Sequence, residues 1–297
     1  MKVRPPRPED LDAVYDVIAA RQEADTGARD VTVGELRDAW GVSGFDLSTD
    51  AQVVEAADQI VAYAEIRAPG GMGYAAPFEE ERRAAKLLLD WMEGRERQLR
   101  RRQHRQAVMS TNRIGQEVLC DAGYERVRSI FRMIRALDGG AGPVALPEAV
   151  ELRPLDIEAD GRDVHSLDGL SFASDADYVP ESFAAFRDEH LHAHDLDPDM
   201  SRVAWRGNTL VGFLLARHWT EQNSGFVDVL AVHPWEEGRG IGRALLQSSF
   251  AAFAKAGLET AQLGVSSENP RALRLYTRLG MTERFRWDIY QRATADQ

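Results

Sequence analysis

The apolar and polar positions in the second half of the chain follow two different periods. Short runs rich in β-branched residues predict strands, and longer segments with apolar residues three and four positions apart predict helices. This pattern predicts a hairpin at 201–205 and 210–219, strands at 226–232, 260–265 and 285–290, and helices at 242–255 and 269–279. Strands that alternate with helices predict an α/β fold with a mixed sheet.

A stretch rich in glycine and proline separates two halves that begin alike. Residues 137–150, LDGGAGPVALPEAV, have no helical periodicity and predict a linker. Each half begins with a short extended piece that contains Arg-Pro and leads into an amphipathic helix, as in KVRPPRPEDLDAV and ELRPLDIEADGRDV. We therefore predict two domains, at residues 1–138 and 149–297.

The two halves also align over a long segment without a gap. Pro77 and Pro234 are 157 positions apart, and so are Gly123 and Gly280. The same spacing pairs aromatic, acidic, apolar and amide residues, namely Phe78 with Trp235, Glu80 with Glu237, Leu88 with Leu245, and Asn112 with Asn269. We interpret the halves as diverged copies of one domain.

The copies differ in a loop that follows a predicted strand, HPWEEGRGIGRALL at 233–246. The second copy has Gly238, Gly240 and Gly242 where the first has Glu81, Arg83 and Ala85. Because glycine costs backbone entropy, three of them at a helix start indicate that the backbone must approach something closely. A glycine loop at a helix N-terminus is typical of a phosphate site. The second copy is therefore predicted to bind a phosphate-bearing cofactor, and the first is not.

The spacing of the loop excludes two common phosphate motifs and matches a third. Arg243 and Ala244 follow the last glycine, so a P-loop is excluded, and the dinucleotide fingerprint fails because Arg243 stands at its third glycine. VHPWEEGRGIGRALL resembles motif A of the GNAT acetyltransferases, [RQ]-x-x-G-x-[GA] after a strand that ends in Val-x-Pro. NPRALRLYTRLGM, at 269–281, resembles their motif B.

The resemblance covers about residues 151–291 and, in degenerate form, 3–136. It implies an α/β protein of two tandem GNAT-like domains, each a mixed, mostly antiparallel sheet flanked by helices. The N-terminal domain would be degenerate, and the C-terminal domain would bind acetyl-CoA and be catalytic. Two such domains also occur in mycothiol synthase, although no residue here indicates that substrate.

The resemblance further implies how acetyl-CoA would be bound as cosubstrate. The backbone of Leu230 and Val232 would hold the acetyl carbonyl and the pantetheine arm. The pyrophosphate would lie on the loop, at Gly238, Arg239, Gly240, Gly242 and Arg243. Asn269 would contact the cofactor or cap a helix. One position departs from the family, because Glu237 places a carboxylate beside the expected anion.

Two residues are the catalytic candidates that the resemblance implies. Tyr276 would protonate the CoA thiolate as it leaves, and the first copy has Leu119 at that position. Asp228 would accept the proton of the amine, directly or through water, or would only cap or orient a neighbouring strand. The alternatives for the base are Glu221, His218 and His233.

The segment 173–197 falls where the family builds its acceptor site. Its acidic residues could attract a cation, and they are Asp175, Asp177, Glu181 and Glu189. His190 and His194 are four positions apart and would share a helical face, yet no third ligand is apparent, so no metal site is predicted. We expect acetyl transfer from acetyl-CoA directly to a primary amine of a small molecule. The alternatives are an acetyl-CoA-binding pseudoenzyme or sensor, and a protein lysine or N-terminal acetyltransferase.

Composition and charge limit the cellular location and the classes of partner that we expect. The net charge of −12 argues against nucleic acid as a partner. The longest strongly apolar stretch, 210–216, is too short to cross a membrane. Cys120 is the one cysteine of the sequence, so no intramolecular disulfide can form and we expect a cytoplasmic protein. A monomer and a homodimer both remain open.

Overall fold

The computed structural model describes residues 1–67, 71–77, 79–101, 103–138, 144–175 and 178–293. Phe78, Asp177 and residues 139–143 of the predicted linker lie outside the described residues. The chain divides into two compact units. Unit 1 is Met1–Phe131, Ser266–Glu268 and Phe285–Gln297, and unit 2 is Arg132–Val265 and Asn269–Arg284.

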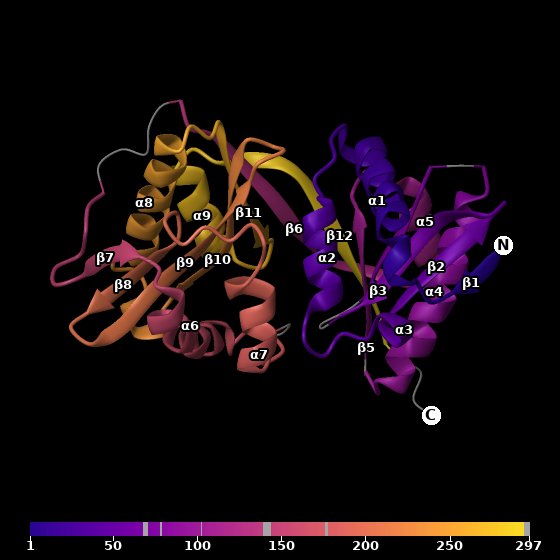
Figure 1. Ribbon diagram of the computed structural model, residues 1–297, viewed down its shortest axis with the longest axis horizontal. Helices are drawn as coiled ribbons and strands as arrows, with labels where there is room; N and C mark the ends of the chain where they lie inside the picture. The colour runs from indigo at the N-terminus through magenta and orange to yellow at the C-terminus, as the bar shows by residue number, and fades with distance from the viewer. Residues whose placement is uncertain (68–70, 78, 102, 139–143, 176–177, 294–297) are drawn as a thin grey trace. The chain divides into compact units, whose positions relative to one another are not determined.

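Unit 1 begins with a short strand and three helices, and a run of strands with two more helices follows. Its elements are β1 (Lys2–Arg4), η1 (Pro8–Asp10), α1 (Leu11–Thr26), α2 (Val33–Gly41), α3 (Leu47–Asp50), β2 (Ala51–Ala56), β3 (Gln59–Ile66), β4 (Gly71–Ala75), α4 (Glu81–Gln98), β5 (Gln103–Met109), α5 (Arg113–Asp121) and the first part of β6 (Glu125–Ala136). Figure 1 draws these elements in indigo to magenta.

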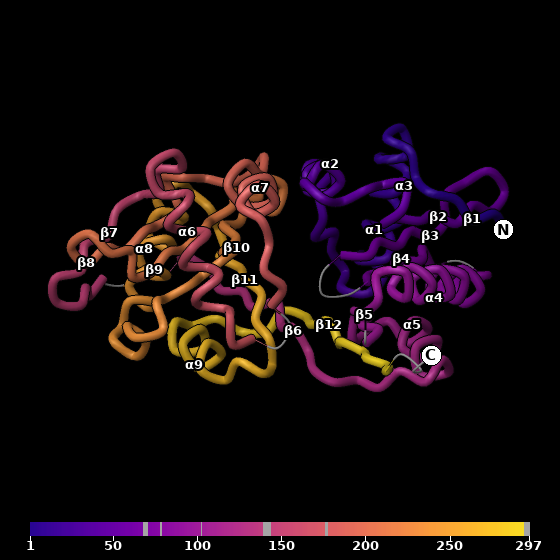
Figure 2. Tube along the Cα trace, turned by 90° about the horizontal axis from the view of Figure 1, so that it is seen from below, coloured from indigo at the N-terminus to yellow at the C-terminus, as the bar shows by residue number. Residues whose placement is uncertain are grey.

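Unit 2 repeats the same order of elements. They are β7 (Glu151–Pro154), α6 (Ile157–Phe172), α7 (Phe183–Phe186), η2 (Arg187–Leu191), β8 (Arg202–Arg206), β9 (Thr209–Trp219), β10 (Ser224–Val232), η3 (Pro234–Glu236), α8 (Ile241–Lys255), β11 (Thr260–Ser266), α9 (Pro270–Arg278) and the start of β12 (Thr282–Ala293). In each unit a first helix and a hairpin precede a strand, a helix, a parallel strand, a helix and a last strand. Figure 2 labels these elements along the trace of the chain.

Two helices cover opposite faces of the sheet in unit 2. Leu167 of α6 packs in one buried cluster with Phe213 of β9. The preceding residue of β9, Gly212, faces the other way, because a β-carbon there would lie 2.9 Å from Ile241 of α8. Side chains of a strand alternate between its two faces. The sheet is therefore enclosed between α6 and α8, which lie on either side of it in Figure 1.

Unit 1 has the same layers. Ile18 of α1 belongs to the cluster of Tyr63 of β3, whereas Leu88 of α4 belongs to the cluster of Ala62 and Ala64. Because Tyr63 alternates with these two alanines, α1 and α4 cover opposite faces of the sheet. The α/β class and the duplicated arrangement of the prediction are confirmed.

The last strand is longer than predicted, and part of it pairs in the sheet of unit 1. The alternating pattern predicted residues 285–290, and β12 runs from Thr282 to Ala293. From Trp287 onward β12 pairs antiparallel with β5, in the sheet of unit 1. An alternating pattern indicates that a strand exists, but it does not identify the neighbouring strand.

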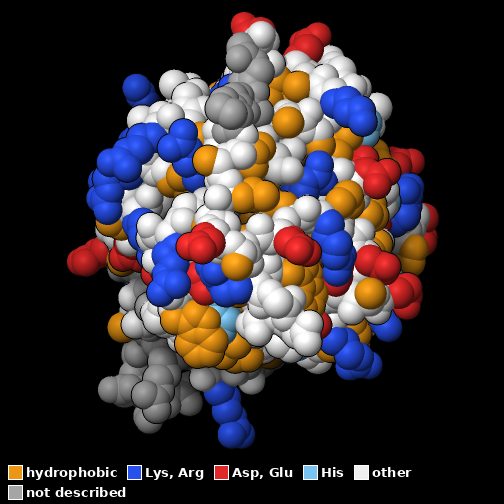
Figure 3. All heavy atoms as spheres, turned by 90° about the vertical axis from the view of Figure 1, so that its left-hand side faces the viewer, with side chains coloured by type: hydrophobic (Ala, Val, Ile, Leu, Met, Phe, Trp, Pro, Cys, Tyr) orange, Lys and Arg blue, Asp and Glu red, His pale blue; other side chains and the backbone are white. Residues whose placement is uncertain are grey.

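The surface carries charges of both signs. Lys and Arg side chains lie interspersed with Asp and Glu on the face shown in Figure 3. Among the described residues, no helix is both long and apolar enough to cross a membrane. Cys120 has a free thiol and is exposed.

Candidate active site

Strands β10 and β11 of unit 2 lie side by side for only part of their length. They pair in parallel from Ser224 with Thr260 to Val227 with Leu263. Beyond that point β10 stays paired with β9 as far as Val232, and a shift of register after Val227 marks a β-bulge at Asp228. Among the described residues, no strand pairs with the second edge of β10 after the bulge.

The backbone of Leu230 and Val232 faces this open edge. The N–H of His233 donates to the Val211 carbonyl at 3.0 Å, on the β9 side. Because successive backbone groups of a strand point to opposite edges, the N–H groups of Val232 and Leu230 point away from β9. The Val232 carbonyl accepts from the Ser171 hydroxyl at 3.3 Å. These two amides have the orientation that the predicted contact with acetyl-CoA requires, and the contact itself stays a prediction.

The glycine loop connects this edge to α8. Gly238 and Gly240 have φ values of 78° and 91°, a left-handed conformation that favours glycine. A β-carbon at either position would meet no atom within 4 Å, so the backbone there borders open space. Gly240 is the N-cap of α8, no side chain caps this helix, and its first turn has no acidic residue. The first N–H groups of α8 are thus available to an anion.

Position 242 needs glycine less strictly than positions 238 and 240 do. A β-carbon there would lie 3.5 Å from Val232 and 3.6 Å from Leu275, which are ordinary contacts. The structure thus explains two of the three glycines by backbone conformation. Close approach of a ligand is the remaining reason for the third.

The charged side chains around the loop are mostly turned toward one another. Glu237, whose carboxylate was expected to repel an anion, forms an ion pair with Arg271 of α9. Arg239 lies 3.5 Å from Glu236, and Arg243 is exposed. The ion pair offsets the charge of Glu237, so the departure from the family motif leaves the loop suited to a diphosphate.

Helix α9 positions the two motif B candidates. Asn269 is its N-cap, and the side-chain oxygen accepts from the N–H of Ala272 at 2.9 Å. Of the two predicted roles for Asn269, the structure shows the helix cap. Tyr276 is 7% exposed, and burial raises the pKa of its hydroxyl to about 12. The hydroxyl is therefore protonated at neutral pH and can act as a donor.

Asp228 lies at the bulge, and one oxygen of its carboxylate has two hydrogen-bond donors. This oxygen accepts from Nδ1 of His190 at 2.8 Å and from Arg217 at 3.0 Å. Burial favours the neutral acid, but Arg217 and His190 outweigh it and hold the pKa of Asp228 far below its usual value. Such a carboxylate is a weak proton acceptor. The geometry favours an orienting role for Asp228, toward the side chains of His190 and Arg217.

His190 lies on η2 beside the ring of Phe186, with ring centroids 4.8 Å apart. Its Nε2 is 3.9 Å from a carboxylate oxygen of Glu181. Burial lowers the pKa of His190, but the charge and hydrogen bond of Asp228 outweigh burial, and the pKa is raised above its ordinary value. An imidazole held in this way is a stronger proton acceptor than a free one.

The expectation that His190 and His194 share a helical face is wrong. The N–H of His192 donates to the Arg187 carbonyl at 2.8 Å, five residues back, and η2 ends at Leu191. His194 lies beyond the end of the helix. Sequence spacing alone does not show where a short helix ends.

Further carboxylates surround His190. Tyr178 donates to Asp168 of α6 at 3.3 Å, and burial raises the pKa of both Asp168 and Glu181. Nearby positive charge on His190 opposes that rise in both carboxylates. A cation that approached these carboxylates would act as His190 does and stabilise their charged form. We call Asp168, Glu181, His190 and Asp228 the acidic cluster.

Sequence reasoning identified part of this cluster. Glu181 was among the acidic residues expected to attract a cation, and Asp168 and Tyr178 were missed. The available signal was an acidic residue in the apolar stretch SLDGLSF of α6, where a buried carboxylate needs a partner. Among the other candidates for the base, His233 stacks on Trp235, with ring centroids 3.9 Å apart, and Glu221 is exposed.

Comparison with known proteins identifies the class to which this fold and site belong. The profile described as "Acetyltransferase (GNAT) family" matches residues 167–281. A mycothiol acetyltransferase of Thermobispora bispora is 33% identical over 178 residues, which cover 56% of this chain and 57% of that protein. One of Gordonia bronchialis is 30% identical over 215 residues, which cover 62% of this chain and 67% of that protein. The chain thus spans little more than half the length of most curated relatives that it matches.

A solved structure described as a tandem GNAT protein from the clavulanic acid biosynthesis pathway shares the fold. It covers 100% of this chain and 99% of its own, with a TM-score of 0.76 and 14% identity. The layered α/β frame, twice in one chain, is therefore the fold of a tandem GNAT protein. The chain belongs to the GNAT family of acetyl-CoA-dependent acetyltransferases. The resemblance and the fold predicted from the motifs are confirmed.

Proposed function

We propose that unit 2 transfers an acetyl group from acetyl-CoA directly to the primary amine of a small molecule. The open edge of β10 carries this proposal, because it leads from the acidic cluster to the glycine loop. The amides of that loop and the N-terminus of α8 suit a diphosphate. The residues present therefore fit acetyl-CoA, which supplies an activated acetyl thioester when bound.

The amides of Leu230 and Val232 would bind and polarise the acetyl carbonyl. Both face the open edge of β10 and belong to a strand that β9 holds rigidly on its other side. Preorganised donors of this kind stabilise the negative charge that develops on a carbonyl oxygen under attack. No side chain is consumed in this role.

His190 is proposed as the proton acceptor, in place of Asp228. It takes a proton from the attacking nitrogen at Nε2 while Asp228 holds Nδ1. The new bond joins the amine nitrogen to the acetyl carbon, and the bond from that carbon to sulfur breaks. Tyr276 gives its proton to the departing thiolate. Asp168 and Glu181 attract the ammonium form of the acceptor before it loses its proton.

The small size of the acceptor rests on two kinds of support. The relatives from Thermobispora bispora and Gordonia bronchialis are named mycothiol acetyltransferases, and mycothiol is a small molecule. The carboxylates of Asp168 and Glu181 are buried or half-buried, which suits a compact amine better than a long polypeptide. The identity of the amine stays open.

Thiol release tests the proposal. The full chain is incubated with acetyl-CoA and a panel of small primary amines, and free thiol and acetylated product are measured together. We expect equal amounts of both with at least one amine. Acetyl-CoA binding without thiol release would instead support a sensor. Acetylation of lysine peptides in preference to small amines would support the protein-directed alternative.

A further inference from the structure

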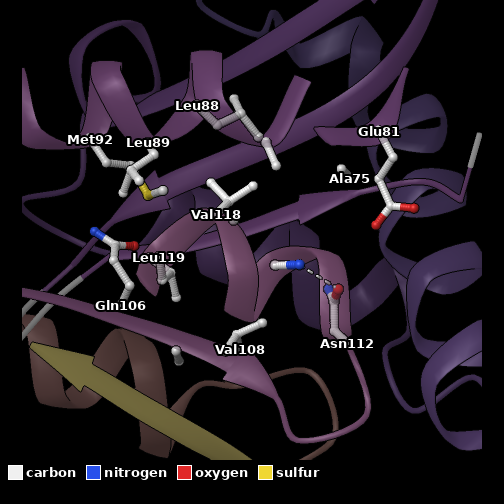
Figure 4. Close-up of a pocket in the computed structure, with 14 residues that line it drawn as sticks. Ala75, Glu81, Leu88, Leu89, Met92, Gln106, Val108, Asn112, Val118 and Leu119 are labelled. Atoms are coloured by element: carbon white, nitrogen blue, oxygen red, sulfur yellow. Dashed lines mark hydrogen bonds between the residues drawn. The ribbon is translucent and has the colours of Figure 1, made fainter. Parts of the chain in front are cut away.

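Unit 1 contains a cleft at the place where its own parallel strands part. β4 and β5 pair only at Gly71 with Gln106 and at Met72 with Ala107. A partly open cleft lies beyond this paired segment. Its walls are mainly apolar and come from α4 and α5, through Ala85, Leu88, Leu89, Met92, Val118 and Leu119 (Figure 4).

One polar side chain at the inner end of this cleft has no hydrogen-bond partner among the described residues. Gln106 is 2% exposed, and neither its amide nitrogen nor its amide oxygen is hydrogen-bonded to any of them. Its amide lies near Gly71, where a β-carbon would be 3.0 Å from Nε2 of Gln106 and 2.9 Å from the sulfur of Met92. A buried amide of this kind is destabilising unless something pairs with it. The cleft therefore offers one donor and one acceptor within an apolar enclosure.

The mouth of the cleft opposes the binding of a nucleotide. Figure 4 shows Glu81 and Asn112 at the opposite end from Gln106. Glu81 stands where unit 2 has Gly238, and its carboxylate is buried against Arg21 at 2.7 Å. The oxygen of Asn112 already accepts from the N–H of Gly115 at 2.8 Å. In place of bare glycine backbone, a diphosphate would meet the side chain of Glu81 here, which is ion-paired with Arg21.

We propose that unit 1 uses this cleft to bind a small, uncharged molecule with an apolar chain and an amide group. The carbonyl of that amide accepts from Nε2 of Gln106, and its N–H donates to Oε1. The chain lies between α4 and the parted strands, against Leu88 and Leu119. The site is independent of acetyl transfer in unit 2.

Hexanamide is the probe, because it has one primary amide and a short apolar chain. The full chain is titrated by saturation-transfer NMR with coenzyme A present to occupy unit 2. We expect hexanamide to bind. Hexanoate has the same length and a negative charge, and its affinity should be lower by at least about tenfold. Absence of hexanamide binding at about 10 mM would overturn the proposal. Displacement of hexanamide by excess acetyl-CoA would overturn the exclusion of a nucleotide.

Three variants locate the probe. Gln106→Met keeps the length of the side chain without its amide and should weaken hexanamide about tenfold, the effect of losing two ordinary hydrogen bonds. Ala85→Phe fills the cleft and should abolish binding. Gln103→Met is the matched control, because Gln103 is an exposed residue of the same strand. Equal affinity in all four proteins would show that hexanamide binds elsewhere.

Thermal stability supplies a second readout without any ligand. Removal of an unpaired buried amide should raise the unfolding midpoint of Gln106→Met, by about 2–4 °C. Hexanamide should raise the midpoint of the unaltered chain and raise that of Gln106→Met by clearly less. A midpoint that falls in Gln106→Met would show that the protein itself satisfies this amide, and the proposal would be wrong.

Discussion

Units 1 and 2 have the same frame and differ where that frame borders open space. In both, two parallel strands part after a short paired segment, which ends at Met72 with Ala107 in one and at Val227 with Leu263 in the other. In both, an asparagine caps the helix after the second strand. Its oxygen accepts a backbone N–H at 2.8 Å in Asn112 and at 2.9 Å in Asn269. A residue kept in both units serves the fold that they share.

The residues found in one unit alone lie along the cleft. Gly240 is a left-handed N-cap in unit 2, whereas the N-cap of the corresponding helix α4 in unit 1 is Glu80, with a φ of −101°. Tyr276 of α9 is replaced by Leu119 in α5. Divergence of two copies therefore separates the residues that the shared fold needs from the candidate ligand residues within a single sequence. The variants below exchange these features or remove the shared ones.

The largest effect is expected when unit 2 receives the loop residue of unit 1. Gly240→Arg should abolish acetyl-CoA binding, a loss of at least about 10³-fold. The φ of 91° strains any residue with a β-carbon, and the side chain would extend into the space of the diphosphate. Isothermal calorimetry measures the affinity. The reverse change, Arg83→Gly in unit 1, is the control and should leave affinity unaltered. Unchanged binding by Gly240→Arg would refute the loop assignment.

A smaller loss is expected from the hydroxyl that unit 1 lacks. Tyr276→Phe should lower turnover by about 10², the lower range for general acid catalysis, and leave acetyl-CoA affinity nearly intact. Steady-state rates and calorimetry together separate the two effects. Tyr290→Phe, at an equally buried tyrosine of β12, is the matched control. Normal turnover in Tyr276→Phe would remove Tyr276 from the mechanism.

Sequence alone predicted the elements and the loop because both depend on local pattern. β10, α8 and α9 begin and end within two residues of their predicted bounds. The positive φ at Gly238 and Gly240 agrees with the glycines that indicated a special backbone there. The long gap-free alignment of the halves also predicted that the same layers would form twice.

The features that the sequence did not predict depend on contacts between residues distant in sequence. The sequence left open whether Asp228 is a base or only orients a neighbour. The answer depends on its ion pair with Arg217 and its hydrogen bond to His190, 38 positions earlier. The capping of α9 by Asn269 was one of two open roles. The unpaired amide of Gln106 has no sequence signal, because glutamine in a strand is usually exposed.

The pH dependence of unit 2 tests the revised roles of His190 and Asp228. His190 must be neutral to accept a proton, so kcat/KM should rise with pH through the pKa of His190, which is raised above its ordinary value. Asp228→Asn removes a negative charge that raises this pKa, so the rise should move to lower pH. His190→Gln should lose the rise altogether. A rise that stays in place, or moves upward, in Asp228→Asn would exclude His190 as the base.

The smallest effects are expected at the residue that both units share. Asn112→Ala and Asn269→Ala should each cost about 1 kcal/mol of stability, because each removes one helix cap. Thermal unfolding should show a similar drop of about 2–4 °C for both variants. Calorimetry then tests the remaining role of Asn269. If it only caps α9, acetyl-CoA affinity changes little in either variant. A loss of acetyl-CoA affinity in Asn269→Ala alone, with an equal loss of stability in both variants, would mean that unit 2 also uses its asparagine to bind the ligand. A residue that both units share would then have an additional role in only one of them.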